Sequence, residues 1–427
     1  MPSFPDHPQR YDLANELHAR PFPSIRHGSQ AAIIALKPVK NAAARDRDAD
    51  RAHLIALLDR YDAQHPKPGA THFSGKLGRY HLKWEQHTEF VTYLVHGEGL
   101  SDRPFDSAIW DLFPQDWMAT APGPRITSAH FRISEGIADD DAISTCLKDW
   151  FEPESLAANR VLDGNAVLAS DFRIDPAGHM RFAIFPRPEA GPARIGRIVQ
   201  RLCEIETYKA MAMLGFPKAG ELNARMAQID TGLSALLRDM TGDSTAPDQQ
   251  LDQLLTYATE LENLMSRASF RFGATGAYEA IVQQRIEILR EERFAGRQTF
   301  AEFMLRRFDP AMRTVKSTET RLRSMTDRAF RAGELLRTKV EVGRSAQNQD
   351  LLESMDRRAA LQLRLQETVE GLSVVAISYY AVSLLSYLLA PVAYEFGIEK
   401  PWVTAALVLP VIAAVWLMTR RIKKMVH

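Results

Sequence analysis

The segment from Leu372 to Pro391 constrains this chain more than any other feature of its sequence. It reads LSVVAISYYAVSLLSYLLAP, twenty residues without a charge, and a helix of that length crosses about 30 Å of hydrocarbon. A second uncharged run follows from Trp402 to Met418. The two runs predict a transmembrane helical hairpin, and a pair of buried core helices is the alternative interpretation.

Charges beside these runs predict how the hairpin is oriented. Three arginines precede the first run and the sequence RRIKK follows the second, whereas the connection contains Lys400 beside Glu395 and Glu399. Since loops rich in Lys and Arg stay in the cytoplasm, we expect both termini on the cytoplasmic side of a bacterial inner membrane. The N-terminal residues have no apolar stretch of the kind that exports a chain. Glu395 and Glu399 are then the acidic residues of a short external loop.

The first run has a polar face within the predicted membrane segment. Six of its seven hydroxyl side chains fall within an arc of about 140° on a helix. A water-lined path through an oligomer would explain this face, and so would hydrogen bonding between packed helices. No charged residue lies in either run, which argues against a proton pump. The candidate pore-facing residues are Ser373, Tyr380, Ser383 and Tyr387.

A net charge of zero conceals a polarised chain. Residues 1–266 have a net charge of −8 and residues 267–364 one of +7, nearly all from arginine. A basic region beside membrane helices attracts anionic headgroups, so membrane lipids are expected partners. The arginines alternate with Glu and lack an aromatic set for base stacking, so nucleic acid is not expected. The two cysteines, Cys146 and Cys203, form no metal-binding or redox pattern and indicate a reducing compartment.

The first 190 residues carry the patterns of β-strands. Tyr80–Phe90 alternates apolar and polar side chains and predicts a strand with one buried face. Loops rich in Pro and Gly separate the other candidates, which predicts an α+β domain with a mainly antiparallel sheet. Further strands are expected at 30–36, 90–95, 125–133, 161–174 and 179–185, and helices at 45–61 and 140–150.

Helical periodicity dominates after residue 190. Breaks are expected at 215–217, 241–247, 273–276 and 309–310, where Gly and Pro occur. No proline lies between Pro310 and Pro391, so one helix is expected to run from about residue 311 into the first membrane segment. Its cytoplasmic part would be roughly 90 Å long. Because such a helix is not stable alone, it must pack on neighbours or form a coiled coil with copies of itself.

An apolar stripe with spacings of three and four residues marks the packed face of this helix. The stripe thins over residues 341–350, where Gly343 marks either a hinge or a solvated stretch. Its six members are Leu322, Met325, Ala329, Ala332, Leu336 and Val340. The predicted organisation is an α+β cytoplasmic domain (1–190), a helical region (191–309), a stalk helix (310–371), the first transmembrane helix (372–391), an external loop (392–401), the second transmembrane helix (402–418) and a basic cytoplasmic tail (419–427).

Four segments together resemble an uncharacterised bacterial family, a domain-of-unknown-function family of membrane-anchored proteins. They are HPQRYDLANELHARPF at 7–22, HLKWEQHTEF around Trp84, ASFRFGATGAYEAIV at 268–282, and QLRLQETVEGLSVVAISYY, which enters the first span. The resemblance covers essentially the whole chain. It implies membrane location and topology, and no activity.

The order of the predicted elements is also similar to that of the CorA-type magnesium channels, which are pentamers whose first span lines the pore. That family carries Gly-Met-Asn at the outer end of the first span. Here the chain has Ala390-Pro391-Val392. Magnesium selectivity is therefore not implied.

Two sets of polar side chains are candidates for binding. Glu16, His18 and Arg20 could hold an anion, or they could tie the N-terminus to the sheet. His81, Glu85 and His87 share one strand face and could hold a divalent cation, or form an ordinary polar face. No other cofactor is indicated. The acidic run 139–141 is more simply a helix N-cap.

Two hypotheses follow from these patterns. The first is a homo-oligomeric inner-membrane protein of CorA-like build that conducts ions along the hydroxyl face of its first span. The alternative is a non-conducting scaffold or sensor, in which the hairpin anchors a cytoplasmic domain that binds a ligand or a protein. An enzyme is not expected, because no nucleophile pattern or phosphate-binding glycine loop is present.

Overall fold

The computed structural model describes residues 4–16, 21–137, 139–240, 247–397 and 399–426. The chain divides into two compact units. The first, which we call the sheet unit, comprises Met1–Ser244 and Asp252–Ala332. The second, the hairpin unit, comprises Thr245–Leu251 and Gly333–His427. Apart from residues 247–251, the helical residues between 190 and Ala332 thus belong to the same unit as the sheet.

A mixed nine-stranded sheet forms the centre of the sheet unit, in the order β2-β3-β4-β1-β5-β8-β7-β6-β9. Pairing between these strands is antiparallel except between β5 and β8, which are parallel. The predicted α+β class and mainly antiparallel sheet are therefore confirmed. The strands are β1 Ser29–Leu36, β2 His72–Leu77, β3 Tyr80–Gln86, β4 Val91–Glu98, β5 Arg125–Ile133, β6 Ala157–Val161, β7 Ala166–Ser170, β8 Met180–Pro186 and β9 Glu292–Arg293.

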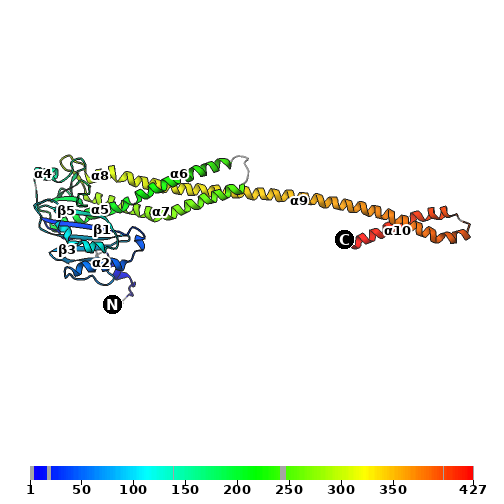
Figure 1. The fold of residues 1–427 in the computed structure, drawn as a ribbon, viewed down its shortest axis with the longest axis horizontal. Coiled ribbons are helices and arrows are strands. Elements are labelled where there is room, and N and C mark those ends of the chain that lie inside the picture. Colours follow the sequence, from blue (N-terminus) through cyan, green and yellow to red (C-terminus); the bar gives the residue numbers. More distant parts are fainter. Residues whose placement is uncertain (1–3, 17–20, 138, 241–246, 398, 427) are drawn as a thin grey trace. The chain divides into compact units, whose positions relative to one another are not determined.

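Helices cover the sheet and continue beyond it (Figure 1). Two short 3-10 helices, Ala42–Ala44 and Ser107–Leu112, lie among the loops. The α-helices are α1 Arg10–Glu16, α2 Arg47–Asp59, α3 Gln115–Ala119, α4 Asp140–Trp150, α5 Pro192–Met213, α6 Gly215–Asp239, α7 Pro247–Leu289, α8 Phe300–Arg307, α9 Asp309–Glu395 and α10 Lys400–Val426.

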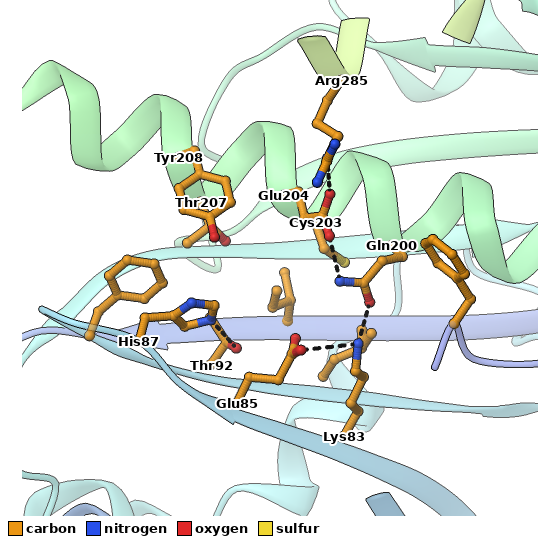
Figure 2. Close-up of a pocket in the computed structure, with 14 residues that line it drawn as sticks. Lys83, Glu85, His87, Thr92, Gln200, Cys203, Glu204, Thr207, Tyr208 and Arg285 are labelled. Atoms are coloured by element: carbon orange, nitrogen blue, oxygen red, sulfur yellow. Dashed lines mark hydrogen bonds and ion pairs between the residues drawn. The ribbon is translucent and has the colours of Figure 1, made fainter. Parts of the chain in front are cut away.

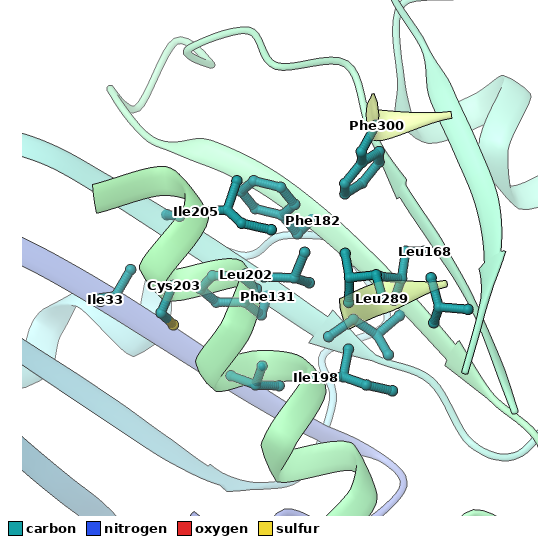
Figure 3. Close-up of a cluster of buried hydrophobic side chains, with 14 of the residues drawn as sticks. Ile33, Phe131, Leu168, Phe182, Ile198, Leu202, Cys203, Ile205, Leu289 and Phe300 are labelled. Carbon is teal, nitrogen blue, oxygen red and sulfur yellow. The ribbon is translucent and has the colours of Figure 1, made fainter. Parts of the chain in front are cut away.

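Both faces of the central strands are buried. On β1, Ile33 belongs to the apolar cluster under α5, whereas Ile34 belongs to the cluster that contains residues of α2. Successive side chains of a strand point to opposite faces, which explains why the β1 sequence SQAAIIAL is almost continuously apolar. Figure 3 shows the first cluster, where Ile198 and Leu202 of α5 lie over Phe131 of β5.

The strand predicted at Tyr80–Phe90 is confirmed only as far as Gln86, where β3 ends. Phe90 follows in a turn and lines the same pocket as Lys83 and Glu85, contrary to the predicted alternation. Within β3 the alternation is correct, but the predicted exposure of the polar face is wrong. Leu82 and Trp84 are fully buried in the α2-side cluster, as expected. Lys83, predicted on a solvated face, is only 7% exposed, because this face lies against α5 rather than water. Glu85 on the same face is half-buried.

The predicted break at Gly273–Gly276 is wrong, because α7 runs unbroken through it. Two glycines cost about 1 kcal/mol each in a helix, but buried residues at intervals of seven hold α7 in place. They are Leu254, Leu261, Ala268, Thr275, Val282 and Leu289. The breaks expected near Gly215 and Pro310 are confirmed by the starts of α6 and α9. Most of the break expected at 241–247 lies outside the described residues.

The long helix predicted from about residue 311 is confirmed as α9, which has 87 residues and includes Pro391. All six members of the predicted stripe are buried. The polar patch at 341–350 does not interrupt the helix, and an added Cβ at Gly343 would meet nothing within 4 Å. Gly343 therefore lies in a solvated helical stretch, with no hinge in its backbone.

Two helices are long and apolar enough to cross a membrane, and both apolar segments lie in the hairpin unit. There α10 runs back beside the end of α9 (Figure 1). Few side chains are buried between them, and those that are buried are small: Ser378, Val382 and Ser386 of α9 and Val411 of α10. Small side chains allow close approach of helices in a membrane.

Candidate functional site

A pocket of about 320 Å³ lies in the sheet unit, over the face of β3 and β4 that α5 covers. Side chains from the two strands form its floor, and α5 and α7 contribute its other walls. Phe22 reaches the pocket from the segment before β1. This segment passes very close to α5, since a Cβ on Gly196 would lie 1.6 Å from the carbonyl oxygen of Pro23. Glycine at 196 is therefore required for Phe22 to take this position.

One face of α5 lines the pocket. Gln200, Cys203, Glu204, Thr207 and Tyr208 all contribute to the lining. Their spacings of three and four residues place them on one side of a helix. The sequence predicted helical periodicity after residue 190, but nothing in it indicated that polar residues of this helix would face a strand carrying Lys83 and Glu85.

A chain of polar contacts crosses the pocket from β3 to α7 (Figure 2). The Lys83 ammonium donates to Gln200 Oε1 at 3.0 Å, and Gln200 Nε2 donates to Glu204 Oε1 at 2.9 Å. Arg285 Nε donates to the other oxygen of Glu204, Oε2. The neutral Gln200 amide thus links the Lys83 ammonium to the ion pair of Glu204 and Arg285. Each charge in the wall has a hydrogen-bonding partner, so none is left uncompensated.

Lys83 also forms an ion pair with Glu85 in the pocket floor. Lys83 Nζ lies 3.3 Å from Glu85 Oε1, and the two side chains are only 8% and 12% exposed. Residues two apart in a strand share a face, which explains why they meet. Buried charges are costly unless paired, so this pair is compensated as it stands.

The opposite end of the pocket is aromatic. The His87 ring stacks on Phe90 at a centroid distance of 4.3 Å, and Tyr208 lies edge-on to both rings. His87 Nε2 also lies 3.4 Å from the hydroxyl of Thr92. A ligand here would meet ring faces at one end and charges at the other.

Two residues of α5 differ in what they can do. Burial raises the pKa of the Cys203 thiol well above its ordinary value, so Cys203 is a neutral wall residue and not a nucleophile. Thr207 is 3% exposed, and its hydroxyl has no hydrogen-bond partner within the part of the chain that the structure describes. A buried hydroxyl without a partner is costly, and this one lines the pocket (Figure 2).

The turn between β3 and β4, residues 87–90, is held from two sides. Arg45 donates to the carbonyl oxygens of His87 at 2.7 Å and of Phe90 at 3.0 Å. Glu89, 1% exposed, accepts hydrogen bonds from Arg271 and from the hydroxyl of Tyr278, the latter at 3.0 Å. Burial, followed by the charge of Glu89, raises the pKa of Tyr278.

These contacts join two of the sequence segments that carry the family resemblance. HLKWEQHTEF contains Glu89, and ASFRFGATGAYEAIV contains Arg271 and Tyr278. Phe22, the last residue of a third segment, lines the same pocket as His87 and Phe90. The turn that positions His87 and Phe90 is thus held by contacts from α7 and from Arg45.

The predicted cation site at His81, Glu85 and His87 is not formed. Glu85 and His87 line the pocket, but the ring of His81 stacks with His96 of β4 at 5.4 Å. His87 lies six positions after His81, just beyond the end of β3. Six positions of extended chain span about 20 Å at 3.3 Å per residue, so sharing a face does not bring the two histidines together. No group of three His, Cys, Asp or Glu side chains could hold a metal ion in the described ranges.

The other predicted site residues are distributed as follows. The side chains of Glu16, His18 and Arg20 lie outside the described residues. In the hairpin unit, Tyr380 and Tyr387 are exposed, Ser383 is half-buried, and the hydroxyl of Ser373 donates to the carbonyl oxygen of Val369. Glu395 and Glu399 are exposed near the connection between α9 and α10. A pore lined by the hydroxyl face stays a prediction.

Comparison with known proteins gives a family and no activity. A family model described as "Protein of unknown function (DUF3422)" matches residues 5–426. Neither the curated proteins nor the solved structures include a match to this chain. The similarity to CorA-type channels is not supported by these comparisons.

Proposed function

Because this chain belongs to the DUF3422 family, whose description assigns no activity, we propose a function from its structure. We infer that it is a membrane-anchored binding protein. The sheet unit takes up a small polar molecule in the pocket over β3 and β4. The hairpin unit holds the sheet unit at the cytoplasmic face of the bacterial inner membrane.

Membrane anchoring is supported by the exposure and the flanking charges of the hairpin unit. Leu384, Leu388 and Leu409 are 70%, 72% and 77% exposed, which is costly in water and favourable in lipid. Arginines and lysines flank the two apolar segments on the side away from the connection. By the positive-inside rule, both termini then lie in the cytoplasm.

Ligand binding rests on one observation above all, the hydroxyl of Thr207. It lines the pocket, it is nine-tenths buried, and it has no partner among the described residues. It lies in the same wall as the polar chain of Gln200 and Glu204. A bound molecule with a polar group would satisfy this hydroxyl and remove the cost of leaving it unpaired.

The test is to identify what the pocket retains. Full-length protein in detergent is equilibrated with a metabolite extract of the expressing cells, washed and denatured, and the released molecules are identified by mass spectrometry. Thr207→Leu replaces the unpaired hydroxyl by an apolar group in the pocket wall, and Thr256→Leu changes an exposed threonine of α7 as the matched control. We expect one compound released from wild type and Thr256→Leu but not from Thr207→Leu. Equal release from all three proteins, or none from wild type, contradicts the proposal.

Ion conduction by a homo-oligomer is a second candidate, and one observation favours it. Tyr380 and Tyr387 are 67% and 69% exposed, while α9 buries Ser378 and Ser386 within the hairpin unit. Part of the hydroxyl face is thus left for other copies of the chain. Replacing Ser383 and Tyr387 by Leu should abolish ion flux in liposomes without preventing insertion. Unaltered flux, or a monomer in native mass spectrometry, would exclude this function.

A further inference from the structure

We propose that the molecule bound in the pocket is a small zwitterion of the amino-acid type, with an ammonium group, a carboxylate and an apolar or aromatic side chain. This inference rests on the proposed function, because it names the chemical class that the same pocket would take. It is drawn from the order of charges, the unused hydrogen-bonding groups and the aromatic wall.

The pocket offers equal numbers of positive and negative groups on each side. The strand floor carries Lys83 beside Glu85, and the helical walls carry Arg285 beside Glu204. A ligand with a single charge would be attracted by one member of each pair and repelled by the other. A molecule that carries a positive and a negative charge a few bonds apart can place each charge against a side chain of opposite charge.

Donors in the pocket have capacity left for a carboxylate. The Lys83 ammonium has three N–H groups, and its contacts among the described residues are Gln200 Oε1 and Glu85 Oε1. The hydroxyl of Thr207 adds a further donor. Charge-assisted bonds to a carboxylate are stronger than those between neutral groups. The ammonium of the ligand would in turn lie against Glu85.

The remaining wall fits an apolar or aromatic side chain. Phe22, Phe90, Leu94 and Ile33 contribute apolar surface, and Tyr208 adds an aromatic ring. The volume of about 320 Å³ lies near the lower limit for small-molecule pockets. A pocket of this size suits a ligand of the size of an amino acid.

Other ligand classes fit less well. Inorganic phosphate or a dicarboxylate could bind Lys83 and Arg285, but it has no cationic group to place against the neighbouring carboxylates of Glu85 and Glu204. A divalent cation would face Lys83 and Arg285, and no set of three metal-binding side chains is formed in the described part of the chain.

The first experiment compares ligands of the same shape that differ in charge. The twenty common amino acids are screened against the full-length protein in detergent by thermal shift, and each hit is measured by calorimetry beside two analogues. One analogue lacks the amino group and the other lacks the carboxylate, as 3-phenylpropionate and 2-phenylethylamine do for phenylalanine. We expect at least one amino acid to bind ten or more times more tightly than both analogues. Equal or tighter binding of a single-charge analogue overturns the inference, and so does the absence of any hit.

The second experiment assigns each charge to its protein partner. Lys83→Met should weaken binding of the amino acid at least tenfold and leave the amine analogue within twofold. Glu85→Gln should likewise weaken binding of the amino acid at least tenfold, and it should leave the affinity for the carboxylate analogue within twofold. The exposed residues Lys76 and Glu287 give the matched controls Lys76→Met and Glu287→Gln, which should change neither affinity. A result in which Lys83→Met and Lys76→Met act alike contradicts the assignment.

Two further outcomes keep the inference falsifiable and separate from the proposed function. If a single substitution unfolds the protein by circular dichroism, the neutral double variant Lys83→Met with Glu85→Gln replaces it, since it leaves no unpaired charge. This variant should fold and lose amino-acid binding, and retained binding overturns the inference. If the pocket retains a compound in the extract experiment and that compound is not zwitterionic, the proposed ligand class is wrong but the proposed binding function stands. No retained compound and no amino-acid hit together overturn both.

Discussion

The sheet unit and the hairpin unit place similar apolar side chains in opposite surroundings. Trp84, Phe131 and Phe182 of the sheet unit are fully buried. Leu384 and Leu388 of the hairpin unit are more than two-thirds exposed. The first unit buries its large apolar side chains in a core of its own, whereas the second leaves most of them exposed. Apolar composition alone therefore does not define a folded core. The proposed membrane anchoring would place the exposed leucines of the hairpin unit in lipid.

The largest effect is expected where a charge enters the exposed apolar surface of α9. Leu384→Arg combined with Leu388→Arg should cost about 2.5–3.5 kcal/mol for each arginine at the centre of a membrane helix. The protein should move from the carbonate-resistant membrane fraction to the soluble or aggregated fraction. Leu361→Arg with Leu363→Arg changes two similarly exposed leucines outside the apolar segment and should leave the protein in the membrane. If both double variants leave the membrane fraction to the same extent, the apolar segment of α9 does not differ from the rest of the helix in anchoring the protein.

A core aromatic of the sheet unit should give the next largest effect. Phe182 is fully buried and stacks on Phe131 at 5.2 Å. Phe182→Ala should lower the free energy of unfolding by about 3–5 kcal/mol, measured by denaturant titration of the protein in detergent. Phe330→Ala, at a side chain of α9 that is 68% exposed, should change it by less than about 0.5 kcal/mol. Similar losses for both would show that exposure in this structure does not separate core from surface.

Acid should destabilise the sheet unit selectively. Burial lowers the pKa of His130 and of His179 to about 4, below the value near 6.5 of an unfolded chain. The unfolded state therefore binds more protons between these values. The contribution of the two neutral histidines to the free energy of unfolding is complete above about pH 6.5. It falls toward pH 4 by about 1.4 kcal/mol per pH unit for each histidine. Denaturant titrations at pH 7 and pH 5 give the difference in the free energy of unfolding between the two pH values. The double variant His130→Gln with His179→Gln should reduce this difference. If the double variant shows the same difference as wild type, these histidines are not the cause of the acid sensitivity.

The smallest effect is expected at Gly343 in α9. The helix is continuous there and a Cβ would meet nothing, so Gly343→Ala should stabilise the local helix by about 0.5–1 kcal/mol. Amide hydrogen exchange of residues 337–349 should slow accordingly. Faster exchange would indicate a hinge that needs glycine, contrary to the structure.

Local patterns in the sequence predicted much of the fold. The strand at 125–133 and the helix at 140–150 were predicted with the bounds that the structure shows, because their periodicity is clear and their ends carry turn or capping residues. β2, with the sequence HFSGKL, was missed because it alternates weakly. β9 has two residues and is defined by its pairing with β6 rather than by any pattern of its own.

The pocket could be predicted only in part. Glu85 and His87 were noted as a polar strand face, but the partners of that face lie more than a hundred residues away, as Gln200 does from Lys83. Charge and periodicity give no information on which helix covers which strand. The metal prediction was wrong for a related reason: a shared face limits direction and not distance.

Labelling of single cysteines in intact cells tests the central contrast most directly. Glu399→Cys lies in the connection of the hairpin unit and Lys67→Cys on the surface of the sheet unit, in a background with Cys146→Ser and Cys203→Ala. A membrane-impermeant maleimide should label Glu399→Cys in intact cells and Lys67→Cys only after lysis. Protection of both cysteines until lysis, or labelling of Lys67→Cys from outside, would contradict a hairpin that crosses the membrane and a sheet unit that stays in the cytoplasm.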